Sequence, residues 1–92
     1  MKLLWTPAAQ RDRDEIYDYI DARDPAAAIA LDERFVDKAS RLVNMPNMGR
    51  AGRVPGTREL VAHRNYVLIY DVTGDQVRVL RVMHAARQWP PE

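Results

Sequence analysis

The stretch Tyr66–His84, YVLIYDVTGDQVRVLRVMH, decides the fold of this chain. It contains two runs rich in β-branched and large apolar residues, Tyr66 to Val72 and Gln76 to His84. The segment between them, Thr73-Gly74-Asp75, is a compact turn signal, because glycine reaches the backbone angles that a tight hairpin needs. The stretch therefore predicts an antiparallel hairpin with an apolar face that other elements must cover.

Two further runs favour strands. Lys2 to Trp5 is apolar enough for a short first strand, and Arg58 to His63 is strand-like and comes directly before the hairpin. The segment Asn44–Gly49 is rich in turn residues and separates these strands from the region before them.

Two helices are expected between the first strand and this turn. Thr6-Pro7 reads as an N-cap followed by proline at the first helical position, and it predicts a helix over residues 8–23. Asp24-Pro25 repeats the signal and predicts a second helix that runs to about Val43 or Met45. The charged run at residues 11–15 is interpreted as a solvated face crossed by ion pairs. The second helix should pack on the first through apolar positions at helical spacing: Ala28, Leu31, Phe35, Ala39 and Leu42.

The predicted order is strand, helix, helix, strand, strand, strand. It indicates an α+β fold in which the N-terminal strand and a helical hairpin pack on a small, mainly antiparallel β-sheet. At 92 residues the chain is expected to form a single domain, residues 1–92.

The composition argues against several classes of protein. The chain has no cysteine, so disulfides and thiolate chemistry are unavailable. Its two histidines, His63 and His84, lack the spacing of a metal site, and we expect neither a metal nor another cofactor. No signal-peptide core or membrane-spanning run occurs in the sequence, so the expected location is the cytoplasm, away from the membrane.

Charge is distributed unevenly along the chain. The net charge is +1, but residues 1–46 hold seven basic and nine acidic side chains, and residues 47–92 hold seven basic and four acidic ones. Three arginines lie in the glycine-punctuated segment Gly49–Leu60: Arg50, Arg53 and Arg58. Guanidinium groups offer planar donors suited to phosphate or carboxylate, which favours an anionic macromolecular partner, with a merely solvated loop as the alternative.

Several segments in order resemble the RelE/ParE superfamily of bacterial toxins, and the ParE-like branch is the closer. The resemblance covers nearly the whole chain. It is carried by Trp5–Ala9, Asp18–Ile20, Gly49–Leu60, Tyr66–Tyr70 and Leu80–Pro90. It implies the toxin of a type II toxin–antitoxin pair, neutralised by a cognate, ParD-like antitoxin from an upstream gene. Operator DNA would then be bound only through the antitoxin.

The superfamily implies two activities. ParE-like members poison DNA gyrase, whereas RelE-like members cleave messenger RNA on the ribosome without a metal. For a nuclease the candidate catalytic residues are Arg64, Arg81 and His84, with help from His63, Tyr66 or Tyr70. RelE-like nucleases typically carry a catalytic arginine at the position of Val67, and their terminal tyrosine or lysine-rich set is not evident. We therefore favour a gyrase-binding poison over an endoribonuclease, and a module that has lost toxicity is a third possibility.

The residues expected to bind the target or the antitoxin are Arg50, Arg53, Arg58, Arg81, Arg87 and Trp89. Some of these residues have structural alternatives. Arg81 could pair with Glu59 or Asp71 across the sheet, and Trp89 could anchor the tail. His84 could be a satisfied, half-buried histidine. Tyr66 and Tyr70 share strand parity with Leu68 and are expected to be structural.

Overall fold

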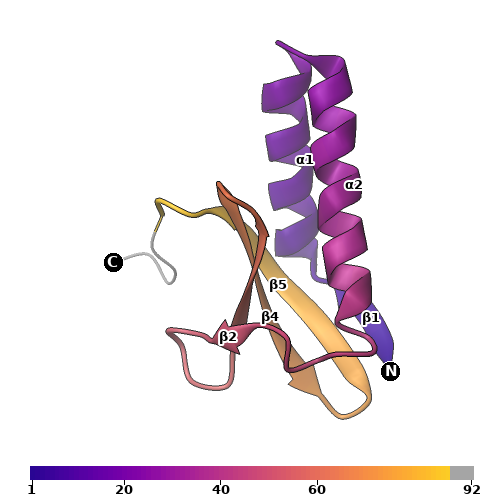
Figure 1. Ribbon diagram of the computed structural model, residues 1–92, viewed down its shortest axis with the longest axis vertical. Helices are drawn as coiled ribbons and strands as arrows, with labels where there is room; N and C mark the ends of the chain where they lie inside the picture. The colour runs from indigo at the N-terminus through magenta and orange to yellow at the C-terminus, as the bar shows by residue number, and fades with distance from the viewer. Residues whose placement is uncertain (88–92) are drawn as a thin grey trace.

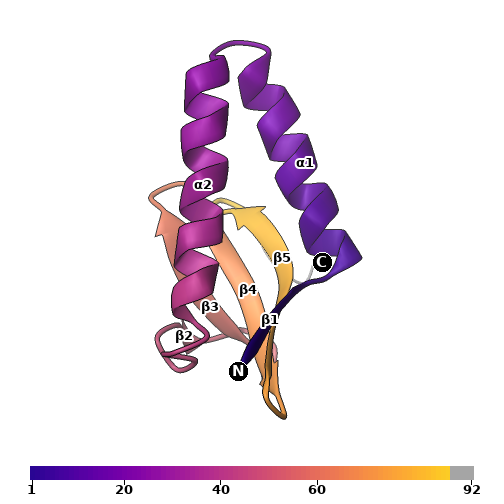
Figure 2. The ribbon, with the colours of Figure 1, turned by 90° about the vertical axis from the view of Figure 1, so that its right-hand side faces the viewer.

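A computed structural model describes residues 1–87, and it confirms the predicted α+β order (Figure 1). The helical hairpin rises above the sheet, so its closed end extends past the strands (Figures 1 and 2). The elements are β1 (Lys2–Trp5), α1 (Pro7–Asp21), α2 (Pro25–Arg41), β2 (Arg50–Ala51), β3 (Arg58–His63), β4 (Tyr66–Thr73) and β5 (Gln76–His84).

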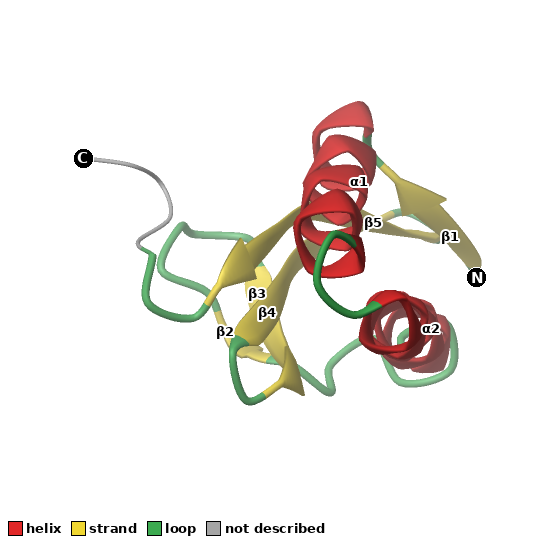
Figure 3. Ribbon diagram, turned by 90° about the horizontal axis from the view of Figure 1, so that it is seen from above, coloured by secondary structure: helices red, strands yellow, loops and turns green. Residues whose placement is uncertain are grey.

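The strands form one sheet in the order β1-β5-β4-β3-β2. The neighbouring pairs among β2 to β5 are antiparallel, as predicted for most of the sheet, whereas β1 lies parallel to β5. The first and last strands are therefore side by side, and the chain passes through both helices between β1 and the rest of the sheet. Both helices cover the same face of the sheet when it is viewed from above (Figure 3).

Strand β2 was not predicted from the sequence. Arg50 pairs with Glu59 and Ala51 with Arg58, and the N–H of Gly52 donates to the carbonyl of Thr57 at 2.8 Å. A two-residue strand is too short to show alternating hydrophobicity, so its pairing depends on contacts across the loop rather than on a local pattern. The glycine-punctuated segment thus forms a small hairpin on the edge of the sheet.

Both predicted helix starts are confirmed. The Thr6 hydroxyl accepts from the N–H of Ala9 at 3.2 Å, and the Asp24 carboxylate accepts from the N–H of Ala27 at 3.1 Å. The Thr6 hydroxyl also donates to the carbonyl of Leu80 at 3.0 Å, at a β-bulge in β5. Thr6 therefore starts α1 and ties that start to the sheet. The helices end at Asp21 and Arg41, two residues or more before the predicted ends, because the residues that follow form turns.

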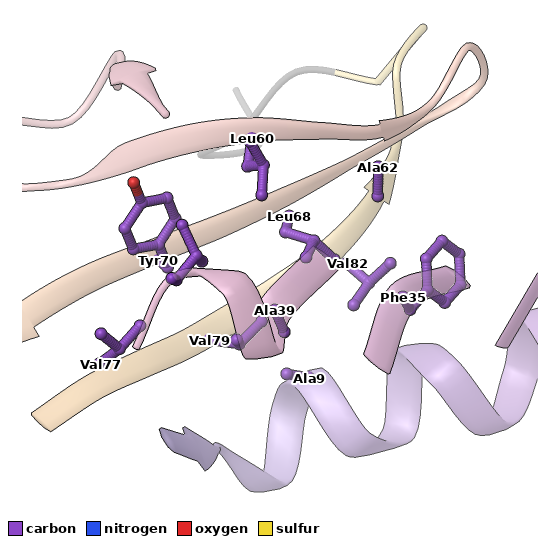
Figure 4. Packing of buried hydrophobic residues seen from close by; sticks show 11 residues of the cluster. Ala9, Phe35, Ala39, Leu60, Ala62, Leu68, Tyr70, Val77, Val79 and Val82 are labelled. Atoms are coloured by element: carbon purple, nitrogen blue, oxygen red, sulfur yellow. The ribbon is translucent and has the colours of Figure 1, made fainter. Parts of the chain in front are cut away.

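The core lies between the helices and the sheet face they cover (Figure 4). Phe35, Ala39 and Leu42 supply the buried positions on the α2 side, as their spacing predicted. Leu68 and Tyr70 of β4 point toward them. The predicted structural role of the β4 residues on this face is confirmed, since Tyr66 also packs against the cluster.

Tyr70 fixes the path of the chain after α2. The N–H of Gly49 donates to its hydroxyl at 2.9 Å, and that hydroxyl donates to the carbonyl of Pro46 at 2.7 Å. A Cβ atom on Gly49 would lie 2.8 Å from the Tyr70 side chain and from the carbonyl oxygen of Glu59, so the close approach requires glycine.

Within residues 1–87, neither helix is long and apolar enough to cross a membrane.

Candidate partner-binding groove

A groove with a volume of about 450 Å³ opens between α1 and the end of β5. We call it the α1–β5 groove. Its walls combine apolar, aromatic, acidic and basic side chains from both ends of the sequence, including Glu15, Ile16, Tyr19, Tyr66, Arg81, His84 and Arg87. This mixture suits a partner segment that presents an apolar side chain beside charged groups.

Arg81 lies in the groove and is held by Asp12 of α1. Its Nε and Nη2 atoms donate to the two carboxylate oxygens at 2.7 and 3.0 Å. The prediction that Arg81 pairs with Glu59 or Asp71 is wrong, since these acids pair with Arg50 and Arg78. The hydrogen bond with Asp12 raises the pKa of the Arg81 guanidinium, so this group remains charged.

Asp12 can reach Arg81 because β5 is longer than the strand beside it. β1 pairs only with residues 76–79, so among residues 1–87 no strand lies beside the outer edge of the remaining part of β5. There the Asp12 carboxylate also accepts from the N–H of Val82 at 2.9 Å. A helix side chain thus satisfies the edge of the sheet, which protects it from pairing with another chain.

The charged run on α1 is therefore not a simple solvated face. The side chain of Asp12 is only 12% exposed. Arg13, 14% exposed, forms an ion pair with Asp32 of α2 at 2.8 Å, and its guanidinium lies 4.4 Å from the Trp5 ring centre. Together these contacts join α1 to α2, β1 and β5.

The three arginines of the Gly49–Leu60 segment do not form one free cluster. Arg50 pairs with Glu59 at 3.1 Å, and Nη1 of Arg58 donates to the carbonyl of Gly49 at 2.8 Å. Arg53 is exposed, and its side chain makes no ion pair within the described part of the chain. Since two of the three guanidinium groups bind within the chain, Arg53 is the one best placed for a partner.

The other candidate residues are divided between the groove and its surroundings. Arg87 is exposed and lines the groove, whereas Arg64 is exposed on the turn between β3 and β4. His84 also lines the groove and is exposed, in contrast to the half-buried alternative. Trp89 lies outside the described residues.

The aromatic side of the groove is anchored in the core. The ring of Tyr66 meets Phe35 edge-to-face with centroids 5.6 Å apart, and it meets His84 in the same way at 5.4 Å. His63 lies 6.2 Å from Tyr66. The groove therefore brings together Arg81 and His84, two of the three nuclease candidates. No group of three or more His, Asp or Glu side chains within residues 1–87 is arranged to hold a metal ion.

Val67 occupies the strand position at which a RelE-like nuclease typically carries its arginine. It is 9% exposed and pairs with Met83 of β5, which is equally buried. Nearby on the same strand, Ile69 is 3% exposed. The Val67 position is therefore buried and apolar, and it supplies no cation.

Sequence reasoning missed Asp12 as a member of the site. A signal was present, because Asp12, Ile16 and Ile20 are spaced by four residues and so share one side of the helix. An acid in line with the apolar stripe is placed to meet the sheet rather than water.

This arrangement, a helical hairpin packed on one face of a mixed sheet, is the one expected of RelE/ParE-superfamily toxins. Residues 3–89 match the sequence model of the ParE toxin of type II toxin–antitoxin systems, parDE, and the chain belongs to this family. The resemblance deduced from the sequence is thereby confirmed.

Two relatives span almost the same length. A Sinorhizobium fredii protein, Y4kP, whose name classes it as a toxin, is 42% identical over 90 residues and aligns with 97% of this chain and 93% of its own. The toxin RelE2 of Caulobacter vibrioides is 36% identical over 86 residues and aligns with 94% of this chain and 97% of its own.

Solved structures agree on the fold. A chain of the chromosomal ParDE toxin–antitoxin system from P. aeruginosa superposes with a TM-score of 0.82 and 31% identity, over 91% of this chain and 95% of that one. A YoeB/ParE toxin from Agrobacterium tumefaciens shares the fold at a TM-score of 0.65 and 20% identity, over 91% of this chain and 98% of that one.

Proposed function

We propose that this chain is a ParE-like toxin that inhibits DNA gyrase by binding to it, and that a cognate, ParD-like antitoxin neutralises it. Membership of the ParE family supports the gyrase target. The observation that carries the choice against a nuclease is Val67, a buried apolar residue where a RelE-like enzyme places a catalytic cation.

The chemistry of RNA cleavage explains why an apolar residue at position 67 argues against a nuclease. Without a metal, the extra phosphate charge in the transition state needs preorganised cations, and losing one such donor costs about 3 kcal/mol. Arg81 is the arginine nearest to Val67 in the pairing of β4 with β5, since it lies opposite Ile69. Its guanidinium is already bound to Asp12, so an incoming phosphate would have to compete with a carboxylate.

A supercoiling assay tests the gyrase target. Purified toxin is expected to block supercoiling of relaxed plasmid by gyrase, and toxin premixed with its antitoxin is expected to restore it. Expression of the chain alone should induce the SOS response. Unchanged supercoiling together with a silent SOS reporter would reject gyrase as the target.

The α1–β5 groove is our proposed docking site for the antitoxin. Ile16 and Tyr19 offer an apolar wall, and Arg87 offers a cation at the same groove, which fits an amphipathic segment with acidic groups. Operator DNA would be reached only through the antitoxin.

Calorimetry with the purified product of the adjacent upstream reading frame tests this docking site. Tyr19→Ala should weaken binding more than 10-fold, as for an aromatic hot spot. Ile29→Ala is the matched control, because Ile29 is also an exposed apolar residue, 48% against 61% for Tyr19, but lies on α2. Equal affinities of the two variants would place the antitoxin elsewhere.

The runner-up function is a RelE-type, ribosome-dependent endoribonuclease. Two observations favour it: the relative from C. vibrioides bears a RelE name, and the groove holds Arg81, His84 and Tyr66 together. Primer extension on translating ribosomes should then show codon-positioned cuts that Arg81→Ala abolishes. Intact message during toxin expression eliminates it, and harmless expression in a host without the antitoxin favours loss of toxicity.

A further inference from the structure

The chain leaves β5 through a turn that the side chain of His84 closes. The N–H of Ala86 donates to Nδ1 of His84 at 3.1 Å, and the N–H of Arg87 donates to the His84 carbonyl at 2.9 Å. The N–H of Ala85 donates to the carbonyl of Asn65 at 2.8 Å. These three bonds set the direction of the chain from the end of the sheet to Arg87.

The neighbouring turn, between β3 and β4, is also closed by a histidine side chain. There the N–H of Asn65 donates to Nδ1 of His63 at 3.2 Å. Tyr66 contacts both imidazoles, with centroids 6.2 Å from His63 and 5.4 Å from His84. The Ala85 to Asn65 bond joins the two turns, so a single unit ends the sheet beside the groove.

These contacts fix where the His84 proton sits. A ring nitrogen that accepts a hydrogen bond uses its lone pair and carries no proton, so the proton of the neutral ring is on Nε2. Protonation of Nδ1 would place two donors against each other and open the turn. The lone pair of Nδ1 is therefore used to accept the hydrogen bond from the N–H of Ala86.

We propose that His84 is a positioning residue: its Nδ1 closes the turn after β5 and thereby sets Arg87 at the mouth of the α1–β5 groove. This inference rests on the proposed role of the groove in binding a partner. It differs from the nuclease hypothesis for the same residue, in which the imidazole must exchange protons with RNA.

Two substitutions of His84 separate the effect of losing the Nδ1 acceptor from the effect of losing the aromatic ring. His84→Asn removes the ring but keeps an oxygen that can accept from the N–H two residues later, as in an Asx-turn. His84→Phe keeps an aromatic edge for Tyr66 but has no acceptor. His63→Phe is the matched control, because it removes the acceptor of the neighbouring turn and should affect the Asn65 amide instead.

Amide exchange of the full-length protein by NMR gives the first readout. His84→Phe should exchange the Ala86 amide about fivefold faster, the factor expected from losing one hydrogen bond, while His84→Asn should remain within about twofold of wild type. The ¹⁵N shifts of the wild-type imidazole should show the proton on Nε2. A proton on Nδ1, or equal Ala86 exchange in all variants, would overturn the proposal.

Affinity for the antitoxin, measured by calorimetry, gives the second readout, and growth arrest on expression of the chain alone gives a third. Because the groove is the proposed antitoxin site, we expect His84→Phe to bind the antitoxin more weakly than His84→Asn does. Loss of arrest in both variants, with normal Ala86 exchange in His84→Asn, would instead assign the ring to chemistry. If wild type itself is harmless, the proposed function fails, while the exchange and tautomer results still decide whether His84 closes the turn.

Discussion

Tyr70 carries one polar atom into the core and uses it to hold a loop. Its hydroxyl both accepts from Gly49 and donates to Pro46, and the residue is fully buried. Tyr70→Phe leaves both groups without this partner and should lower the free energy of unfolding by about 1–3 kcal/mol in urea titrations. Tyr19→Phe, at an exposed site, is the control and should change it by less than about 0.5 kcal/mol. Equal effects would contradict this role for the hydroxyl.

For single residues, the sequence predicted the sheet face on which a side chain lies better than it predicted the contacts of that side chain. Strand parity placed Tyr70 with Leu68, and both are buried. The partners of the hydroxyl lie 21 and 24 residues away, and that of Arg81 lies 69 residues away. Such contacts depend on how the elements pack, so the sequence suggested only the nearer acids Glu59 and Asp71 as possible partners of Arg81 and not Asp12.

The start of α1 illustrates how one residue connects two elements. Thr6 caps the helix and also donates to the Leu80 carbonyl of β5, whereas Asp24 at the start of α2 makes the cap bond alone. Thr6→Ala should therefore cost about 2 kcal/mol in thermal or urea unfolding, and Asp24→Ala about 1 kcal/mol. Thr6→Ser keeps both bonds and should recover most of the loss. A larger cost for Asp24→Ala would refute the second role of Thr6.

The contact between α1 and β5 should be strongly coupled. Asp12 binds Arg81 twice and also the N–H of Val82, with side chains 12% and 34% exposed for the ion pair. A double-mutant cycle with Asp12→Ala and Arg81→Ala should give a coupling energy of about 1–2 kcal/mol. The Asp37–Arg41 pair on α2 is the control, because both side chains are more than half exposed, and its coupling should stay below about 0.5 kcal/mol. Similar coupling energies in both cycles would mean that the Asp12–Arg81 pair joins α1 to β5 no more strongly than an exposed ion pair would.

Elements with local signals were predicted nearly to the residue, and elements defined by distant partners were not. Caps and apolar spacing located both helices, and the Thr73–Asp75 turn, with Gly74 at a φ of +60°, located the last hairpin. Strand β2 and the parallel pairing of β1 with β5 have no local signature. The groove was missed for the same reason, since its walls come from opposite ends of the chain.

On the scale of the whole molecule, acidic and basic side chains are separated along the chain. Residues 1–46, which include both helices, hold nine of the 13 acids, and every basic residue after position 46 is an arginine. In the part of the chain that the structure describes, three of these arginines form ion pairs, with Glu59, Asp71 and Asp12. The positive field available to a partner should therefore come mainly from exposed residues such as Arg53 and Arg87.

This charge placement should control how fast an acidic antitoxin associates. Arg53→Glu combined with Arg87→Glu should slow association about 10-fold in stopped-flow measurements at low salt, and the difference should fade near 1 M salt, where the screening length is about 3 Å. Arg11→Glu combined with Arg34→Glu makes the same change in net charge on exposed helix positions and should slow association much less. If both double variants slow it equally at every salt concentration, net charge and not the placement of Arg53 and Arg87 governs the encounter.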